Sequence, residues 1–271
     1  MASSYDTTSI KVYDNEVIQD KLENQLTTQL DMNQFITIDN SLSATPGMKV
    51  EVHKYKGNGN VQDLTMSNGN TGDIGSEFTT STYEVKTTQG RVPYYDEQIM
   101  NDPVAIDKAL QHLSEQLTND LTSKVVAELG KATNIAYSFD FTFSAVVDAI
   151  ASMPNEQDNG LYMLISKEDY ATLQKNLNDN LKYVEDFARR GYVGTVAGVP
   201  VYVSKAITKG TAFMATREAI TAFVKKGVEV EQEREPNTRK TTVYGRKVMV
   251  IALTDDTKAV KLTTSAKPTG A

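Results

Sequence analysis

The sequence contains no cysteine, no tryptophan and only two histidines in 271 residues. Without cysteine it can have no disulfide framework, no thiolate nucleophile and no cysteine-ligated zinc or iron–sulfur site. The histidines, His53 and His112, lie far apart, the first in an expected strand and the second on the polar side of an expected helix. A shared metal site or acid–base pair is therefore not indicated, and we expect no metal and no cofactor.

Long apolar runs, basic clusters and catalytic motifs are also missing. No run is long enough to span a bilayer, and residues 1–6 lack the basic and apolar parts of a signal peptide. The formal net charge of −7 opposes binding to nucleic acid. Since no nucleophile elbow, metal pair or histidine-centred dyad is present, the sequence does not indicate an enzyme. We expect a cytoplasmic protein that neither enters membranes nor reads DNA sequence.

The first 45 residues are mostly polar. Residues 1–13, which include Tyr13, have only scattered apolar side chains, a composition typical of an extended arm. From Asp14 or Asn15, a suitable N-cap, an apolar residue recurs at every fourth position. These residues are Ile18, Leu22, Leu26 and Leu30. The spacing predicts a short amphipathic helix, which could pack on its own domain or bind a partner.

Residues 48–99 alternate in two stretches, Lys49–Tyr55 and Phe78–Tyr95, around a segment rich in glycine and asparagine. The pattern predicts a long two-stranded ribbon. So little apolar content makes such a pair marginal alone, so we expect it to lie on its own domain or, preferably, on a neighbouring subunit. Gly57 and Gly59 lack the spacing and ending of a phosphate loop and indicate a turn. Candidate contact residues here are Lys54, Lys56 and Tyr83.

The next segment carries the clearest local signal. Asp102 can cap a helix, Pro103 suits its first position, and Gly130 can end it. Seven apolar residues form one stripe between these limits: Ile106, Leu110, Leu113, Leu117, Leu121, Val125 and Leu129. The spacing predicts a helix of about 27 residues, roughly 40 Å long at 1.5 Å per residue. A single stripe favours a helix that lies across a sheet over a coiled coil, which would need more heptads.

Residues 138–227 alternate short helix and strand patterns, which predicts a compact mixed domain. Thr142 can cap a helix over Phe143–Met153, and Ser166 with Asp169 forms a capping box for a second helix. The expected strands are Leu161–Ile165, Val199–Val203, Ala212–Ala215 and Ala219–Val224.

Residues 228–262 alternate strongly and predict three strands of one long antiparallel sheet, at 228–235, 239–253 and 259–262. Four glutamates share one side of the first strand, and four basic residues fall on the second. They are Glu229, Glu231, Glu233 and Glu235, and Arg239, Lys240, Arg246 and Lys247. The pattern fits ordinary cross-strand pairs on a solvated face. It also fits a charged contact between subunits, for which the candidate residues are Glu229, Glu231, Arg234, Arg239 and Arg246.

The order of arm, ribbon, long helix, mixed domain and closing strands resembles the major capsid proteins of tailed bacteriophages, which have the HK-ninety-seven-type α+β fold. The segments that carry the resemblance best are Asp102–Pro103, Ala197–Ser204 and Glu233–Lys247. The resemblance divides the chain into an N-terminal arm, an extended E-loop, the spine helix of a peripheral domain, an axial domain, and a return to the peripheral domain with a C-terminal tail. The corresponding residues are 1–45, 48–99, 100–137, 138–227 and 228–271.

The resemblance implies a virion protein, assembled in the host cytoplasm, whose hexamers and pentamers close an icosahedral shell around double-stranded DNA. Only a short polar stretch precedes the first expected helix, so a separate scaffolding protein is expected, together with a portal and a decoration protein. Some relatives crosslink subunits, but no motif supports a bond from Lys54 or Lys56 to Asn237, and we expect none. The alternatives are an encapsulin-like compartment shell and, from the glycine-, asparagine- and tyrosine-rich loops, a carbohydrate-binding or adhesion module.

Overall fold

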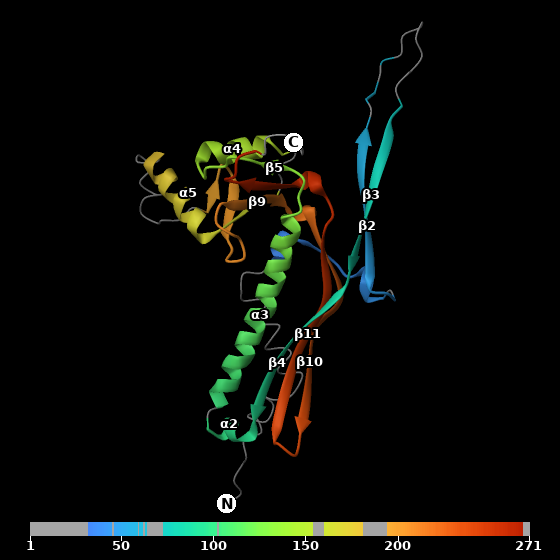
Figure 1. The fold of residues 1–271 in the computed structure, drawn as a ribbon, viewed down its shortest axis with the longest axis vertical. Coiled ribbons are helices and arrows are strands. Elements are labelled where there is room, and N and C mark those ends of the chain that lie inside the picture. The colour runs from blue at the N-terminus through green and yellow to red at the C-terminus, as the bar shows by residue number, and fades with distance from the viewer. Residues whose placement is uncertain are drawn as a thin grey trace, which may run out of the picture.

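The computed structural model describes residues 32–44, 46–58, 60–61, 63, 73–101, 103–153, 160–180 and 194–267. Within them, an elongated body carries a two-stranded ribbon that projects from one side (Figure 1). One end of the body is built on a six-stranded sheet, and the other is a long four-stranded sheet with a helix across it. The predicted arm and the helix after Asp14 lie outside the described residues.

The six-stranded sheet has the order β5-β12-β9-β6-β8-β7. Its strands are β5 (Ile135–Ala136), β6 (Leu161–Ile165), β7 (Thr195–Val196), β8 (Val199–Val203), β9 (Thr211–Thr216) and β12 (Ala259–Thr263). All five residues of the central strand β6 are buried. Met163 packs with residues of α4 (Phe143–Ala151) and α5 (Lys167–Asn180) on one face, while Leu164 joins a second core on the other. A continuous apolar run is expected for a strand covered on both faces.

Two predicted helix starts in this part are confirmed. The Thr142 hydroxyl accepts a hydrogen bond from the Ala145 N–H at 3.2 Å, although α4 ends at Ala151, before the predicted Met153. The Ser166 hydroxyl accepts from the Asp169 N–H at 3.1 Å and donates to the Asp169 carboxylate at 2.8 Å. That carboxylate also accepts from the Gly210 N–H at 2.7 Å. The buried capping box therefore fastens α5 to the turn before β9.

The four-stranded sheet has the order β1-β10-β11-β4. Its strands are β1 (Thr37–Asp39), β10 (Ile220–Glu235), β11 (Lys240–Leu253) and β4 (Lys86–Tyr95). A short helix, α2 (Asp96–Asn101), leads from β4 into α3 (Pro103–Leu129), whose bounds match the prediction. The first half of the α3 stripe packs on the sheet, against Tyr94, Val230 and Val243. The second half, from Leu121, enters the core beneath the six-stranded sheet, so α3 spans both ends of the body (Figure 1).

Two glycines allow α3 to approach the sheet closely. Gly90 on β4 lies opposite Gly245 on β11, and both are beneath Leu113. A Cβ atom on Gly90 would lie 2.2 Å from the Leu113 Cδ1 atom, and one on Gly245 would lie 3.1 Å from Cδ2. Side chains at these positions would push the helix off the sheet, because packed interiors leave no room for an added methyl group.

The ribbon consists of β2 (Lys49–Asn58) paired antiparallel with β3 (Gly75–Glu84). The prediction of one strand over Phe78–Tyr95 is wrong, because the chain changes sheets at Val85. That residue is buried, its N–H donates to the Met48 carbonyl at 2.8 Å, and β4 then pairs with β11 instead of β2. Alternation is the same in both strands and does not reveal which partner each one takes.

The closing strands also differ from the prediction. The expected strands 219–224 and 228–235 form the single strand β10, with register shifts between Val224 and Glu229. The expected domain boundary at 227 and 228 therefore falls inside a strand. β12 does not join β10 and β11, because the turn η6 (Asp256–Lys258) redirects the chain and β12 pairs with β9 and β5 instead. The prediction of three strands in one sheet is therefore wrong.

A short segment near the N-terminus, residues 32–36, packs into the core, which was not predicted. The turn η3 (Met32–Phe35) places Met32, Phe35 and Ile36 in the core beneath the six-stranded sheet. The buried Tyr162 hydroxyl donates to the Phe35 carbonyl at 3.0 Å, and the Arg217 Nε donates to the Ile36 carbonyl at 2.9 Å. This part of residues 1–45 therefore contributes to the core of its own chain.

Candidate functional site

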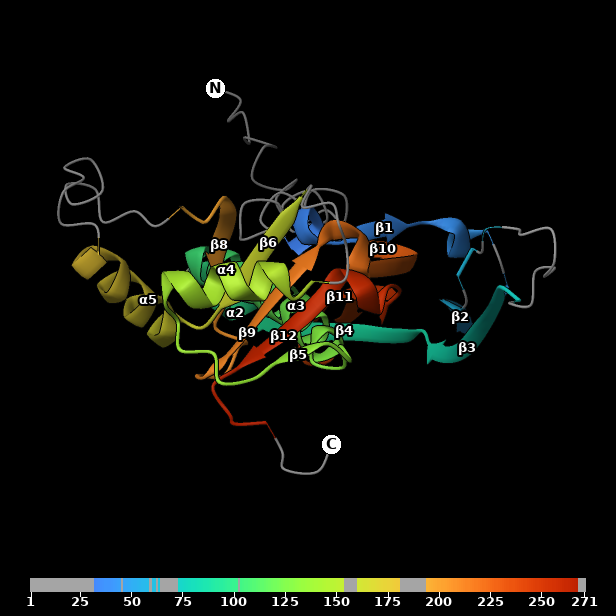
Figure 2. The ribbon, with the colours of Figure 1, turned by 90° about the horizontal axis from the view of Figure 1, so that it is seen from above.

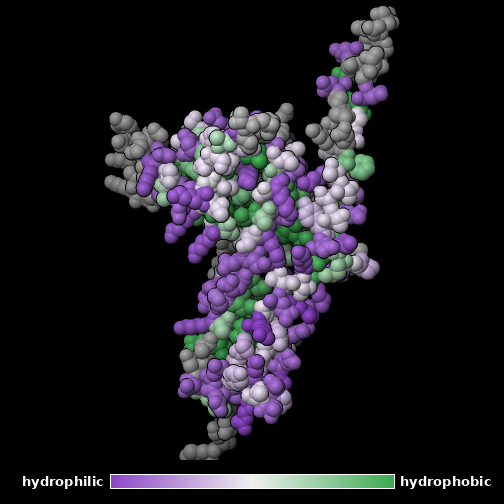
Figure 3. Space-filling model, in the orientation of Figure 1, coloured by the Kyte–Doolittle hydropathy of each residue, from purple (hydrophilic) through white to green (hydrophobic). Residues whose placement is uncertain are grey.

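The ribbon, defined as β2, β3 and the described residues of the loop that joins them, is the first candidate contact surface. It stands clear of the body in Figure 1 and in the view from above in Figure 2. Toward its tip the apolar side chains are exposed: Phe78 is 66% exposed, Ile74 65% and Val61 87%. In Figure 3 the ribbon lies beside the body, and the visible surface of the four-stranded sheet and α3 is mostly hydrophilic. Exposed apolar residues on a thin ribbon without a core make it a candidate contact surface.

The two faces of the ribbon differ near its base. Because side chains alternate along a strand, Val52, Lys54 and Tyr83 share the face toward the body. Val52 is buried there, and Lys54 and Tyr83 contact the body as described below. His53 lies on the opposite face, where its Nδ1 is 2.9 Å from the Thr80 hydroxyl and its ring stands edge-on to Phe78.

Polar contacts join the ribbon base to the body. The Lys54 Nζ is 3.2 Å from the Asp256 Oδ2 in the turn η6. The Lys131 Nζ, just beyond α3, lies 5.8 Å from the centre of the Tyr83 ring. Burial raises the pKa of Tyr83, and the nearby carboxylates of Glu128 and Asp256 raise it further. Lys54 and Tyr83, predicted as contacts with a neighbour, therefore contact their own chain in the subunit.

The second candidate surface is the face of the four-stranded sheet opposite α3, which we call the charged face. It carries Glu229, Glu231, Glu233 and Glu235 on β10, and Lys240, Tyr244 and Arg246 on β11. The Arg246 guanidinium binds the Glu229 carboxylate at 2.8 Å and the Glu231 carboxylate at 2.7 Å. Hydrogen bonds from Lys226, and then from Arg246, lower the pKa of Glu229. The hydrogen bond with Glu229 raises the pKa of Arg246 in turn.

Other residues of this sheet pair in the same local way. The Tyr244 hydroxyl donates to the Glu233 carboxylate at 3.0 Å, and that bond raises the pKa of Tyr244. The Arg234 guanidinium binds Asp96 at 2.9 Å, on the side of the sheet toward α3. Lys247 does not share a face with Arg246, because neighbouring residues in a strand point to opposite faces. Cross-strand pairs within one chain, which were one of the two interpretations, are therefore present.

The remaining predicted contact residues are less informative. Arg239 is exposed in the turn between β10 and β11, where its φ of 49° is in the left-handed region. The Lys56 backbone belongs to β2, but its side chain and all of Tyr13 lie outside the described residues. A contact between subunits stays a prediction for every one of the nine candidates.

The described part of the chain also contains an open cleft of about 370 Å³ between the ribbon base and α3. Residues from β3, α3 and β11 line it, including Tyr83, Lys124, Glu128 and Met249. Across the described ranges, no group of three or more acidic or histidine side chains is placed to hold a metal ion. No helix in those ranges is long and apolar enough to cross a membrane.

Residues 78–262 match a family model described as phage capsid protein. The chain belongs to the phage capsid protein family. The match covers more than half of the chain, from β3 to β12. This is a family of shell proteins and not of enzymes, so the function of this capsid protein is structural, as a subunit of the phage virion.

Individual relatives support this assignment along most of the chain. The major capsid protein of Staphylococcus phage phiMR11 is 22% identical over 266 residues, 92% of each protein. The capsid of Ralstonia phage GP4 is similar in structure, with a TM-score of 0.65, 10% identity and 89% of each chain covered. A virus-like particle from Pyrococcus furiosus has a TM-score of 0.61 at 15% identity, with 91% of this chain and 98% of that chain covered.

These similarities confirm the predicted α+β fold of the HK-ninety-seven type and the resemblance to major capsid proteins. They give no support to a carbohydrate-binding or adhesion module. Of the stretches that suggested such a module, Gly57 and Asn58 belong to β2 and Tyr94 and Tyr95 to β4, whereas residues 67–72 lie outside the described residues.

Proposed function

We propose that this major capsid protein forms hexamers and pentamers that close an icosahedral phage head around double-stranded DNA. The observation that carries the proposal is the ribbon, whose exposed apolar residues Ile74 and Phe78 have no core of their own chain to cover them. In a ring of subunits each ribbon would lie over the next subunit and gain that cover. The hydrophobic area removed from water would then favour the assembled form.

The same proposal assigns roles to the other parts of the chain. Residues 1–45 would tie neighbouring rings together as an arm that residues 32–36 hold in their own subunit, and the six-stranded sheet with α4 and α5 would meet around the centre of each ring as an axial domain. The ribbon would be the E-loop, and α3 with the four-stranded sheet the peripheral domain. The charged face would meet a neighbour through the carboxylates not used by Arg246.

The net charge of the chain fits a shell that encloses DNA without binding it tightly. A net charge of −7 provides no electrostatic attraction to phosphates. Assembly in the host cytoplasm, with a separate scaffolding protein, a portal and a decoration protein, is part of the proposal.

The test is to express the chain with and without the ribbon tip and to image both by negative-stain electron microscopy. We expect shells, tubes or rings from the full chain, and folded but unassembled subunits when residues 59–74 are replaced by a short turn. A variant with the tip sequence scrambled keeps the ribbon length and separates lost contacts from lost reach. Normal shells from the shortened chain, with an unchanged circular dichroism spectrum, would contradict the proposal.

The second candidate function is a compartment shell that encloses protein cargo. The similarity to the virus-like particle from Pyrococcus furiosus favours it, since that similarity covers 91% of this chain. Nuclease-protected double-stranded DNA in particles from infected cells would establish the phage head, whereas particles with protein cargo and no DNA would establish the compartment.

A further inference from the structure

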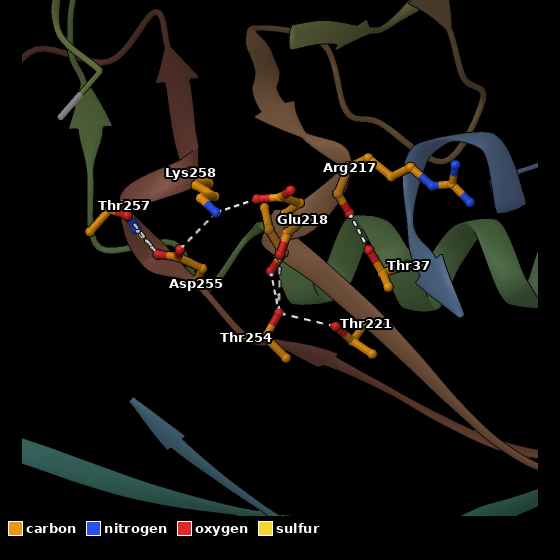
Figure 4. Close-up of polar contacts among 9 residues, drawn as sticks. Thr37, Arg217, Glu218, Thr221, Thr254, Asp255, Thr257 and Lys258 are labelled. Carbon is orange, nitrogen blue, oxygen red and sulfur yellow. Dashed lines mark hydrogen bonds and ion pairs between the residues drawn. The ribbon is translucent and has the colours of Figure 1, made fainter. Parts of the chain in front are cut away.

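The turn η6, which carries Asp256, is held firmly in the body (Figure 4). The Asp255 carboxylate caps it by accepting from the Thr257 N–H at 2.9 Å. Lys258 binds both Glu218 and Asp255, and the bond with Glu218 raises the pKa of Lys258. The Asn134 amide donates to the Asp256 carbonyl at 2.8 Å. Asp256 therefore occupies a fixed position in the body.

Lys54 on β2 joins the ribbon to Asp256 through an ion pair. The Lys54 and Asp256 side chains are 23% and 25% exposed, and they meet at 3.2 Å although the residues are far apart in the sequence. Their partial burial makes the ion pair less screened by water and salt than the exposed pair of Lys49 and Glu84, which lies on the ribbon itself at 3.9 Å. The other carboxylate oxygen of Asp256 is buried without a hydrogen-bond partner among the described atoms, so Lys54 is the charge this carboxylate binds.

On the same face of the ribbon base as Lys54, packing against the body is incomplete. An open cleft of about 370 Å³ lies there, between β3 and α3. Across it, Lys131 meets the Tyr83 ring at 5.8 Å, a distance at which the attraction is weak for partly exposed groups. Because the cleft leaves few packed side chains between β3 and α3, polar contacts such as the Lys54–Asp256 ion pair contribute to fixing the angle of β3.

We propose that Asp256 sets the angle at which the ribbon leaves the body, through its ion pair with Lys54. Asp256 is a positioning residue: it determines where the exposed apolar tip lies before any other chain covers it. The inference concerns contacts within one chain and does not depend on the proposed assembly.

The absence of cysteine from the native chain makes a direct distance measurement possible. We would introduce Ser76→Cys on β3, on the face of the ribbon opposite Lys54, and Ser123→Cys on α3, and attach a spin label to each of these exposed positions. Full-length labelled chain, diluted in unlabelled chain, would be measured by pulsed electron double resonance. We expect one narrow distance distribution in the parent, and loss of that single distribution in both Asp256→Asn and Lys54→Met.

Two controls separate the ion pair from general damage. Glu84→Gln removes the exposed ribbon pair and should leave the distribution narrow, while the exchange of charges in Lys54→Asp with Asp256→Lys should restore it. Lys54→Met changes only the ribbon side, so it remains informative if Asp256→Asn weakens the fold of η6. A narrow distribution that is unchanged in both single variants would overturn the proposal, and so would a broad distribution in the parent.

Discussion

Strand β6 and the ribbon show two ways in which one chain uses β-structure. All five residues of β6 are buried, between the helices α4 and α5 on one face and the core that includes α3 on the other. In the ribbon, Val52 is the one hydrophobic residue of the described side chains that is buried, and Phe78 is 66% exposed. β6 is therefore stabilised by packing within its own chain, whereas the ribbon depends mainly on its ladder of hydrogen bonds.

The largest effect on the subunit should come from shortening a side chain in β6. Leu164→Ala removes a fully buried side chain, and we expect a loss of about 2–5 kcal/mol in the free energy of unfolding, from lost burial and the cavity left behind. Urea unfolding of the unassembled chain would measure it. Val61→Ala, at a residue 87% exposed in the ribbon tip, is the matched control and should change stability by less than about 0.5 kcal/mol. Equal losses of unfolding free energy in the two variants would contradict the difference between β6 and the ribbon.

A smaller effect on the free energy of unfolding should test whether water reaches the core around β6. Burial raises the pKa of Tyr162, whose hydroxyl donates to the Phe35 carbonyl. Tyr162→Phe should cost roughly 0.5–1.5 kcal/mol at neutral pH by removing that bond. The raised pKa of the folded state contributes stability below the unfolded pKa of about 10, and this contribution is lost as the pH rises above it.

The native chain should therefore lose stability faster than Tyr162→Phe between pH 9 and 11, where the difference between the two proteins shrinks and then reverses. Urea midpoints across that range would show it, and the other tyrosines are common to both proteins. A difference that stays constant with pH would mean that water reaches the Tyr162 hydroxyl.

The smallest effect on the stability of the subunit should come from a substitution in the ribbon. The same substitution should have a large effect on assembly. Phe78→Ala should change the free energy of unfolding by less than about 0.5 kcal/mol, because the ring is mostly exposed. We expect the yield of sedimenting particles to fall, since the ring is one of the apolar groups that a neighbour would cover. Thr79→Ala, on the opposite face of the same strand, is the control. Full particle yield from Phe78→Ala would show that this residue contacts no other subunit.

Elements with strong local signals could be predicted from the sequence. The bounds of α3 follow from Pro103, the repeated apolar positions and Gly130, because a helix is set by interactions within a few residues. The strand at Leu161–Ile165 follows from five consecutive apolar residues next to a capping box. The short strands β1 and β5 were missed, since two or three residues are too few for any period to show.

The membership of strands in sheets could not be predicted. β3 and β4 carry the same alternating pattern and are separated only by Val85, yet β3 pairs with β2 and β4 with β11. β12 alternates like β10 and β11 but belongs to the other sheet. Period-2 patterns define which side chains share a face, while the choice of neighbour depends on packing between distant segments.

The contacts of the candidate residues also divide into those that could be predicted from the sequence and those that could not. The glutamates of β10 and Arg246 were recognised because they lie on adjacent strands of one hairpin, where spacing determines the pairs. Lys54 was also singled out, but its partner Asp256 was not, because an ion pair between residues so far apart depends on the whole fold.

The position of β4 in the sheet also affects how the chain is made. β4, at residues 86–95, forms its ladder with β11, at residues 240–253, and both lie beneath α3. During synthesis from the N-terminus, β4 and α3 leave the ribosome well before β11 exists, so the apolar stripe of α3 has no complete sheet to cover it. Such long-range pairing is slow to form. The apolar stripe of α3 therefore stays exposed on the nascent chain until residues 240–253 have been made, and an exposed stripe of this kind favours aggregation during that interval.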